Sequence, residues 1–181
     1  MSQRQEARDL AEERIFEAAV KIFSQFGYES SSVRMIAKEA GVSPGLLYNY
    51  FKNKEELLVR VFEEGLKDVQ ATFRDLPDDG QVKTYLLHNF RIMQEKKQLW
   101  RLIYLIRMQQ STLAILGERI NRVQKQVLDR LEARLRSSLG DKARAEAVLL
   151  NASLEGVVFH YLFDNSFEFE LAQQALLTRY S

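Results

Sequence analysis

Side chains that can hydrogen-bond to a nucleic acid are concentrated between Arg34 and Lys54. Arg34 is long enough to reach a guanine, and Asn49 can either read a base edge or donate to a phosphate. Tyr48, Tyr50 and Lys54 carry the hydroxyl and ammonium donors that phosphate oxygens accept. These residue types, so close together, indicate recognition of a nucleic acid through hydrogen bonds and charge.

Two short helices are expected to position these side chains. Ser31 or Ser32 can cap the first helix, because a short hydroxyl side chain accepts from the free N–H groups of the first turn. Gly41 suits the end of that helix, where the backbone needs a positive φ. Ser43 then caps the second helix, and Pro44 takes its first position, where the missing N–H costs nothing. The apolar face of the first helix consists of Val33, Ile36, Ala37 and Ala40.

The second helix is predicted to turn one face inward. Leu47 and Phe51 are four residues apart and share that face. Two short helices joined by a turn with glycine form a helix-turn-helix, whose second helix fits the DNA major groove. Such pairs are also common in helical proteins that do not bind DNA, so spacing alone leaves DNA binding and plain packing both open. The residues left outside are Pro44, Gly45, Tyr48, Asn49 and Tyr50.

The segment from Phe26 to Leu57 resembles the DNA-binding segment of TetR-family transcriptional regulators. The family pattern is a Phe-Gly-aromatic turn, then Thr/Ser-x-x-x-Ile-Ala-x-x-Ala-Gly-Val-Ser, then Leu-Tyr-x-x-Phe-x-x-Lys-x-x-Leu. The resemblance covers about the first third of the chain. The residues that carry it are Phe26-Gly27-Tyr28, Ser32, Ile36-Ala37, Ala40-Gly41-Val42-Ser43, Leu47-Tyr48, Phe51, Lys54 and Leu57.

The resemblance implies a DNA contact at each matching position. Serine at position 32 replaces the commoner threonine, which is a mild change. Pro44 stands where many members carry a basic or small polar residue, so readout there is expected to be apolar and weak. The implied phosphate contacts are Ser32, Tyr48, Tyr50 and Lys54, and the implied residues at or near the bases are Arg34, Pro44, Gly45 and Asn49, with Ser43 in the same surface.

Composition favours a helical, globular protein. The chain has 181 residues, of which 46% are hydrophobic and 28% charged, with only two prolines and eight glycines. It contains no cysteine and two histidines, so we expect no disulfide, metal site or cofactor. The polar N-terminus lacks the apolar core of a signal peptide, and no apolar run nears about 18 residues. We therefore expect a soluble cytoplasmic protein.

The charge is arranged locally rather than overall. The net charge of +1 is nearly neutral, whereas nucleic-acid binders are often strongly basic. Between Ser30 and Lys54, four basic residues (Arg34, Lys38, Lys52 and Lys54) face a single acidic residue, Glu39. This modest patch suits a dimer, in which two patches add.

Nine helices are predicted, in an all-α fold. Besides the two short helices, apolar periodicity indicates helices over about 8–26, 53–74, 81–94, 99–109, 111–138, 142–164 and 167–180. The strongest break is Leu76-Pro77-Asp78-Asp79-Gly80. We predict a helix-turn-helix head over 1–54, a linking helix over 54–75, and a ligand-sensing and dimerisation body over 76–181.

The resemblance also implies a homodimer, a small-molecule effector and a palindromic DNA operator. Small residues in the last two helices would let two copies pack as a four-helix bundle. An aromatic and methionine-rich body would suit an apolar or planar ligand, although each such residue also fits a plain core. Candidate pocket residues are Phe62, Tyr85, Phe90, Met93, Trp100, Tyr104, Met108 and Phe159; candidate dimer residues are Ala152, Ser153, Gly156, His160, Phe169, Ala172 and Leu176.

Two other functions compete with DNA binding: an enzyme and a helical adaptor. An enzyme is disfavoured because the sequence lacks a Gly-rich phosphate loop, HExxH, GxSxG and a cysteine nucleophile. A helical adaptor without specific DNA binding would keep the helix-turn-helix only as structure. The sequence predicts a sequence-specific transcriptional regulator, a repressor released by its effector.

Overall fold

The computed structural model describes residues 3–74 and 81–180, and the side chains of 6–67 and 81–180. Every element in these residues is helical, which confirms the all-α prediction with nine α-helices. The predicted break at 76–80 lies outside the described residues. The elements are α1 (Gln3–Ser30), α2 (Val33–Glu39), α3 (Pro44–Tyr48), α4 (Lys54–Arg74), α5 (Val82–Glu95), α6 (Lys97–Met108), α7 (Gln110–Leu139), the 3₁₀ turn η1 (Gly140–Lys142), α8 (Ala143–Phe163) and α9 (Phe169–Arg179).

The chain divides into two compact units. The first comprises Met1–Gly65 and Arg101–Gly117, and the second comprises Leu66–Trp100 and Glu118–Ser181. The segment Arg101–Gly117, which the sequence pattern assigned to the body, thus belongs to the same unit as the helix-turn-helix.

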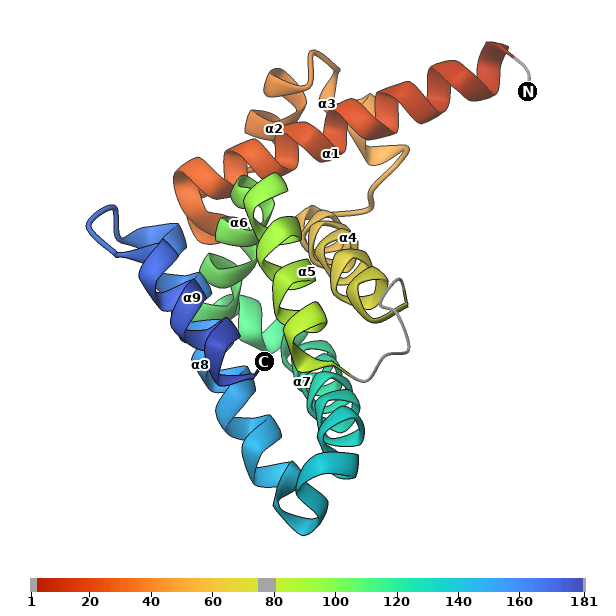
Figure 1. Cartoon of the computed structure of the whole chain (residues 1–181). Coiled ribbons are helices and arrows are strands. Elements are labelled where there is room, and N and C mark those ends of the chain that lie inside the picture. The colour runs from red at the N-terminus through yellow and green to blue at the C-terminus, as the bar shows by residue number, and fades with distance from the viewer. Residues whose placement is uncertain (1–2, 75–80, 181) are drawn as a thin grey trace. The chain divides into compact units, whose positions relative to one another are not determined.

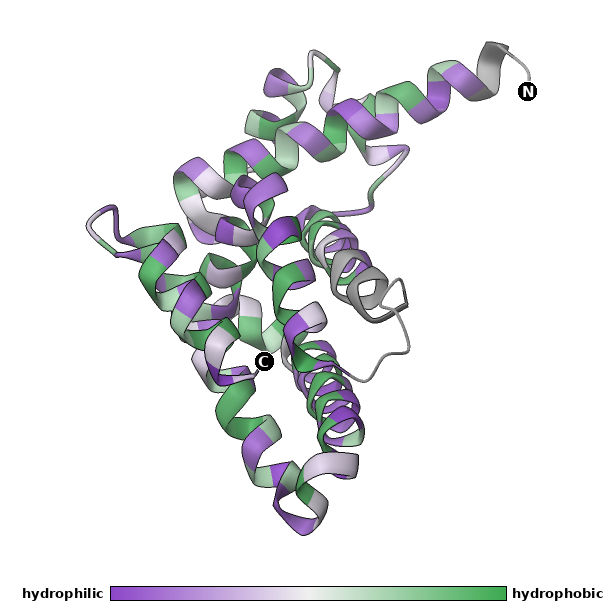
Figure 2. Cartoon of the chain, viewed as in Figure 1, coloured by the Kyte–Doolittle hydropathy of each residue, from purple (hydrophilic) through white to green (hydrophobic). Residues whose placement is uncertain are grey.

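In the first unit, α2 packs against α1, and α3 packs against α2 (Figure 1). Hydrophobic and hydrophilic residues alternate along α1, as an amphipathic helix requires (Figure 2). The helical geometry breaks at Gly27, with φ 75° and ψ 167°, in a region of backbone conformation that favours glycine. This break confirms the predicted end of the first helix and redirects the chain toward α2.

A glycine also sets the packing of α4 against α6 in the first unit. A Cβ added to Gly65 would lie 2.8 Å from Cδ1 of Ile103. The missing side chain therefore lets these two helices approach closely. The surrounding core includes Leu57, Leu58 and Val61, all fully buried.

The second unit has an aromatic core. The Phe169 ring packs edge-on against Phe90, with ring centroids 5.7 Å apart, and lies 4.4 Å from the Tyr161 ring. Leu86 and Met93 of α5 are buried in the same unit. The start of α9 is therefore fixed by contacts with both α5 and α8.

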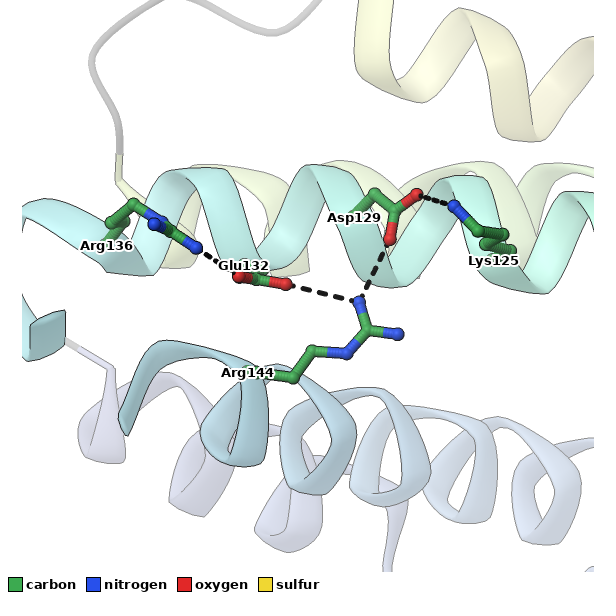
Figure 3. A network of polar contacts seen from close by, with 5 residues as sticks. All are labelled: Lys125, Asp129, Glu132, Arg136 and Arg144. Atoms are coloured by element: carbon green, nitrogen blue, oxygen red, sulfur yellow. Dashed lines mark hydrogen bonds and ion pairs between the residues drawn. The ribbon is translucent and has the colours of Figure 1, made fainter. Parts of the chain in front are cut away.

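An ion-pair network joins α7 to α8 in the second unit (Figure 3). Arg144 of α8 donates to Asp129, 3.0 Å away, and to Glu132, 3.3 Å away. Within α7, Lys125 also pairs with Asp129, and Arg136 also pairs with Glu132. The hydrogen bond from Lys125, followed by that from Arg144, lowers the pKa of Asp129. Because most of these side chains are exposed to solvent, the network contributes little to stability.

Among the helices whose residues are described, none is long and apolar enough to cross a membrane.

Candidate nucleic-acid interface

The first helix of the pair, α2, is closed at both ends by local hydrogen bonds. The hydroxyl of Ser32 accepts from the backbone N–H of Met35 at 3.3 Å, which selects Ser32 over Ser31 as the cap. At the other end, Gly41 has φ 65°, and the N–H of Val42 donates to the carbonyl of Ala37 at 3.0 Å. This arrangement is a Schellman motif, which satisfies carbonyls that the helix leaves free.

The second helix, α3, begins as its sequence predicts. The hydroxyl of Ser43 accepts from the N–H of Leu46 at 3.1 Å, and Pro44 occupies the first helical position. Leu47 is fully buried and Phe51 almost so, which confirms the predicted inward face. Because both ends of the turn are pinned, the outer face of α3 has a defined orientation on the first unit.

Most of the predicted contact residues are exposed on this outer face and on α2. The Tyr48 ring is 53% exposed. Tyr50 is half-buried, and the guanidinium of Arg8 lies 5.9 Å from the centre of its ring. Arg8 thus brings a positive charge from α1 to the edge of the interface, a contribution the sequence pattern did not reveal. The exposed predicted residues are Ser32, Arg34, Ser43, Pro44, Gly45, Tyr48 and Asn49.

Lys54 is the exception among the predicted contacts, because its ammonium group is engaged within the fold. Nζ donates to the carbonyls of Tyr28 at 2.7 Å and Ser31 at 2.9 Å, and lies 3.4 Å from that of Glu29. It also lies 4.3 Å from the centre of the Tyr28 ring. Three carbonyl partners can take all three ammonium hydrogens. Lys54 therefore clamps the connection between α1 and α2.

Burial and charge act on Lys54 in opposite directions. Burial lowers its pKa, and the nearby Glu29 carboxylate partly offsets this by favouring the charged form. Burial also raises the pKa of Tyr28, and Glu55 adds to that shift. The clamp thus pairs a charged lysine with a neutral tyrosine ring.

The start of α4 completes the interface. Asn53 accepts from the N–H of Glu56 at 2.8 Å and so caps the helix. The Glu56 carboxylate in turn accepts from the N–H of Lys52 at 2.6 Å. These two hydrogen bonds fix the backbone at the start of α4, and Lys52 is exposed.

A further residue of this surface, which the family motif does not single out, is Leu46. It directly precedes the buried Leu47, yet it is 38% exposed. Helical periodicity was the available signal, because Leu46 lies three residues before the outward Asn49.

The candidate pocket residues divide between the two units. In the first unit, Phe62 and Tyr104 are buried, whereas Met108 is 59% exposed. In the second, Trp100 and Phe159 are half-buried, and the Phe159 ring packs on Phe163 at 5.0 Å. The remaining candidates form buried core of the second unit: Tyr85, Phe90 and Met93.

Two buried ring nitrogens in the second unit are more informative. Nε2 of His88 and Nε1 of Trp100 have no hydrogen-bond partner within the described part of the chain. The other His88 ring nitrogen, Nδ1, lies 3.1 Å from Arg91, which can only donate, so Nε2 carries the proton. Both unpaired nitrogens therefore carry N–H donors. Buried N–H donors rarely lack a hydrogen-bond partner.

The candidate dimer residues differ in accessibility. Ala152, Gly156 and His160 are exposed on α8, and Ser153, Ala172 and Leu176 are half-buried. Phe169 is only 4% exposed, because its ring fills the core against Phe90 and Tyr161.

A capped helix pair that presents donors on the outer face of its second helix defines the class of helix-turn-helix DNA-binding proteins. Residues 15–61 match the sequence model of the bacterial regulatory proteins of the tetR family. An uncharacterized HTH-type transcriptional regulator of Bacillus subtilis, YhgD, is 32% identical over 132 residues, covering 69% of this chain and 67% of that protein. The chain belongs to the TetR family.

Two further similarities cover different extents of the chain. The fatty acid metabolism regulator protein of Bacillus subtilis is 38% identical over 74 residues, which cover 40% of this chain and 38% of that protein. The solved structure of the transcriptional regulator FadR from Bacillus subtilis in complex with stearoyl-CoA matches with a TM-score of 0.71. That match covers 91% of this chain and 95% of that one at 24% identity. It shows that the two chains share a fold.

Proposed function

We propose that this protein is a homodimeric repressor that binds a palindromic operator and is released by a small, largely apolar effector. The observation that carries the proposal is the outer face of α3, held in place by the caps at Ser32 and Ser43 and exposing Tyr48 and Asn49. A two-fold dimer carries two such faces, and these match two half-sites about one helical turn apart.

Selection of random duplex DNA by the purified protein tests the DNA-binding part. We expect a palindrome with half-sites about one helical turn apart. A matched control is the double variant Tyr48→Ala, Asn49→Ala, which should recover no motif while keeping its helical circular dichroism. Selection of unrelated sequences by the wild type, with and without a metabolite extract, would contradict the proposal and favour the adaptor function.

The proposed dimer surface is an apolar stripe on α8. Its members recur at intervals of three and four residues and are all exposed: Ala145, Leu149, Ala152 and Gly156. Leu171 of α9, 64% exposed, adds to the apolar surface of this pair of helices. Phe169 is left out because it is already buried within its own chain. Leu149→Arg should give a monomer in analytical ultracentrifugation, whereas Arg122→Ala on exposed α7 should remain a dimer.

The proposed effector combines an apolar body with at least one hydrogen-bond acceptor. The aromatic residues of the second unit supply apolar contacts, and the unpaired donors of His88 and Trp100 are suited to a carbonyl or carboxylate oxygen. The stearoyl-CoA complex of FadR makes an acyl thioester a sensible probe. Binding would act by population shift, favouring a separation of the two heads that no longer fits successive major grooves.

The role of the unpaired donors can be tested with Trp100→Phe, which keeps an aromatic ring but removes the N–H. Thermal shift and operator release should be measured with stearoyl-CoA and with free long-chain fatty acids. We expect the variant to bind its effector about 5- to 20-fold more weakly, the loss of about one hydrogen bond, with little loss of stability in the free protein. Unchanged effector affinity would remove Trp100 from the site.

A further inference from the structure

The outer face of α3 is apolar where it begins. Pro44 and Gly45 are exposed and carry no polar side chain, and Leu46 follows them with 38% of its surface exposed. Hydrogen-bonding side chains appear only later, at Tyr48 and Asn49. A base edge that meets the first turn of α3 therefore meets aliphatic carbon and peptide backbone.

The exposure of Leu46 has no structural use within the first unit. Leu47 and Phe51 already fill the inward side of α3. Leu46 instead contributes its backbone N–H to the cap at Ser43, which fixes the helix while its side chain projects outward. An exposed, rigidly held aliphatic side chain on a recognition helix is positioned for contact with a partner.

The chemistry of the major groove identifies the partner group. Each base pair presents hydrogen-bond donors and acceptors there, and thymine alone adds a methyl group, at C5. Asn49, three residues further along the same helix face, carries an amide that can pair bidentately with adenine. The two side chains together are therefore suited to an A·T pair or to adjacent A·T pairs.

We propose that Leu46 is a specificity-determining residue that reads the C5 methyl group of a thymine in each operator half-site. This inference rests on the proposed function. It adds that the first turn of α3 selects a thymine. It also assigns the base contact to Leu46 rather than to Pro44, because the ring of proline is tied to the backbone at the start of the helix and reaches less far.

Thymine-to-uracil substitution in the selected operator tests the inference directly, because it removes only the methyl group. Each thymine of a half-site is replaced in turn, and the dissociation constant is measured by fluorescence anisotropy. We expect one position per half-site at which uracil weakens binding about fourfold, the effect of burying one methyl group, and about 16-fold when both half-sites are changed. Equal affinity for thymine and uracil at every position would overturn the inference.

A double-mutant cycle assigns the effect to Leu46. In Leu46→Ala the uracil penalty should vanish, whereas Leu46→Met, which retains an apolar side chain, should keep it. Leu87→Ala is a matched control, since Leu87 is 46% exposed in the second unit, and it should show the full wild-type penalty. A penalty that persists in Leu46→Ala would assign the methyl contact to another residue and overturn the proposal.

Failure of this inference is distinguishable from failure of the proposed function. If selection returns no operator, the regulator proposal and this inference both fall. If an operator is recovered and bound tightly but is insensitive to uracil, only the role of Leu46 is wrong. The wild-type uracil series needs no variant, so the test stands even if Leu46→Ala folds poorly.

Discussion

The α2–α3 pair and the α8–α9 pair are each two consecutive helices, but they are built in opposite ways. In the first pair, Ser32 and Ser43 cap the helices through hydrogen bonds to backbone groups three residues away. In the second pair, neither Lys142 nor Glu168 makes a side-chain cap. Hydrophobic residues instead recur along α8 (Figure 2), and Phe169 anchors α9 in the core.

This difference corresponds to what each pair would meet. Local caps hold α3 in place without using its outer face, so that face is free to meet the groove of DNA. The α8–α9 pair depends on packing, and its exposed surface still includes Val148, Leu149 and Leu171. An apolar surface of this kind is suited to a second apolar surface rather than to a polyanion. In the proposed dimer, the same chain would separate a DNA-facing region from a self-association region by how its helices are stabilised.

The largest expected effect tests whether the α8–α9 pair depends on core packing, by removing a ring that anchors α9. Phe90→Ala deletes a ring that is 1% exposed and packs against Phe169. We expect a loss of about 3–5 kcal/mol in the free energy of unfolding, measured by urea titration of circular dichroism. Leu87→Ala, on an exposed side chain of α5, is the control and should change stability by less than about 0.5 kcal/mol. A loss below about 1 kcal/mol for Phe90→Ala would show that the packed pair does not depend on this contact.

The Lys54 clamp can be separated from a phosphate contact by comparing it with its exposed neighbour Lys52. Lys54→Ala removes a charged donor from the carbonyls of Tyr28 and Ser31, and should cost about 1.5–3 kcal/mol of stability. Lys52→Ala should leave thermal unfolding nearly unchanged but lower affinity for all DNA sequences and reduce the salt dependence. If Lys54→Ala melted like the wild type and bound DNA more weakly, its ammonium would belong to the phosphate and not to the fold.

A comparison of two exposed basic residues of α2, Arg34 and Lys38, tests which of them contacts a base. Arg34→Ala should cost about 1–3 kcal/mol in operator affinity and relax preference at one base pair, because a guanine contact is lost. Lys38→Ala should weaken binding to all sequences about equally, as expected of a phosphate contact. Selection repeated with each variant distinguishes these outcomes. A uniform loss for Arg34→Ala would place its guanidinium on the backbone.

The smallest expected effect concerns the end of α9. The hydroxyl of Tyr180 donates to Glu146 of α8 at 2.6 Å, and Arg179 donates to the same carboxylate at 3.2 Å. The Tyr180 hydrogen bond, followed by that of Arg179, lowers the pKa of Glu146 below its ordinary value of 4.5. The stability that this contributes is therefore present above pH 4.5 and is lost as pH falls through the lower folded-state pKa.

Tyr180→Phe tests that assignment. Thermal midpoints should be measured between pH 6 and pH 3 for the variant and the wild type. The wild type should lose more of its midpoint over this range, since it has more to lose when Glu146 is protonated. Parallel curves would show that the contact between α8 and α9 does not depend on this carboxylate.

The sequence by itself determined the helices and the caps of the recognition pair. Ser43 and Gly41 could be assigned in advance, because Ser43 bonds to backbone three residues away and Gly41 turns the backbone at its own position. The inward face of α3 followed from the four-residue spacing of Leu47 and Phe51 for the same reason. Local chemistry of this kind can be read from residue order alone.

Only the tertiary structure decided the places of Lys54, Phe169 and Arg8. Lys54 meets carbonyls 23 to 26 residues earlier in the chain, and the ring of Phe169 meets that of Phe90 on another helix. Arg8 reaches Tyr50 from the far end of α1. A lysine at a helix start looks the same in sequence whether its ammonium faces solvent or carbonyls. Packing decides between these environments, because burial and partners come from segments that sequence spacing does not bring together.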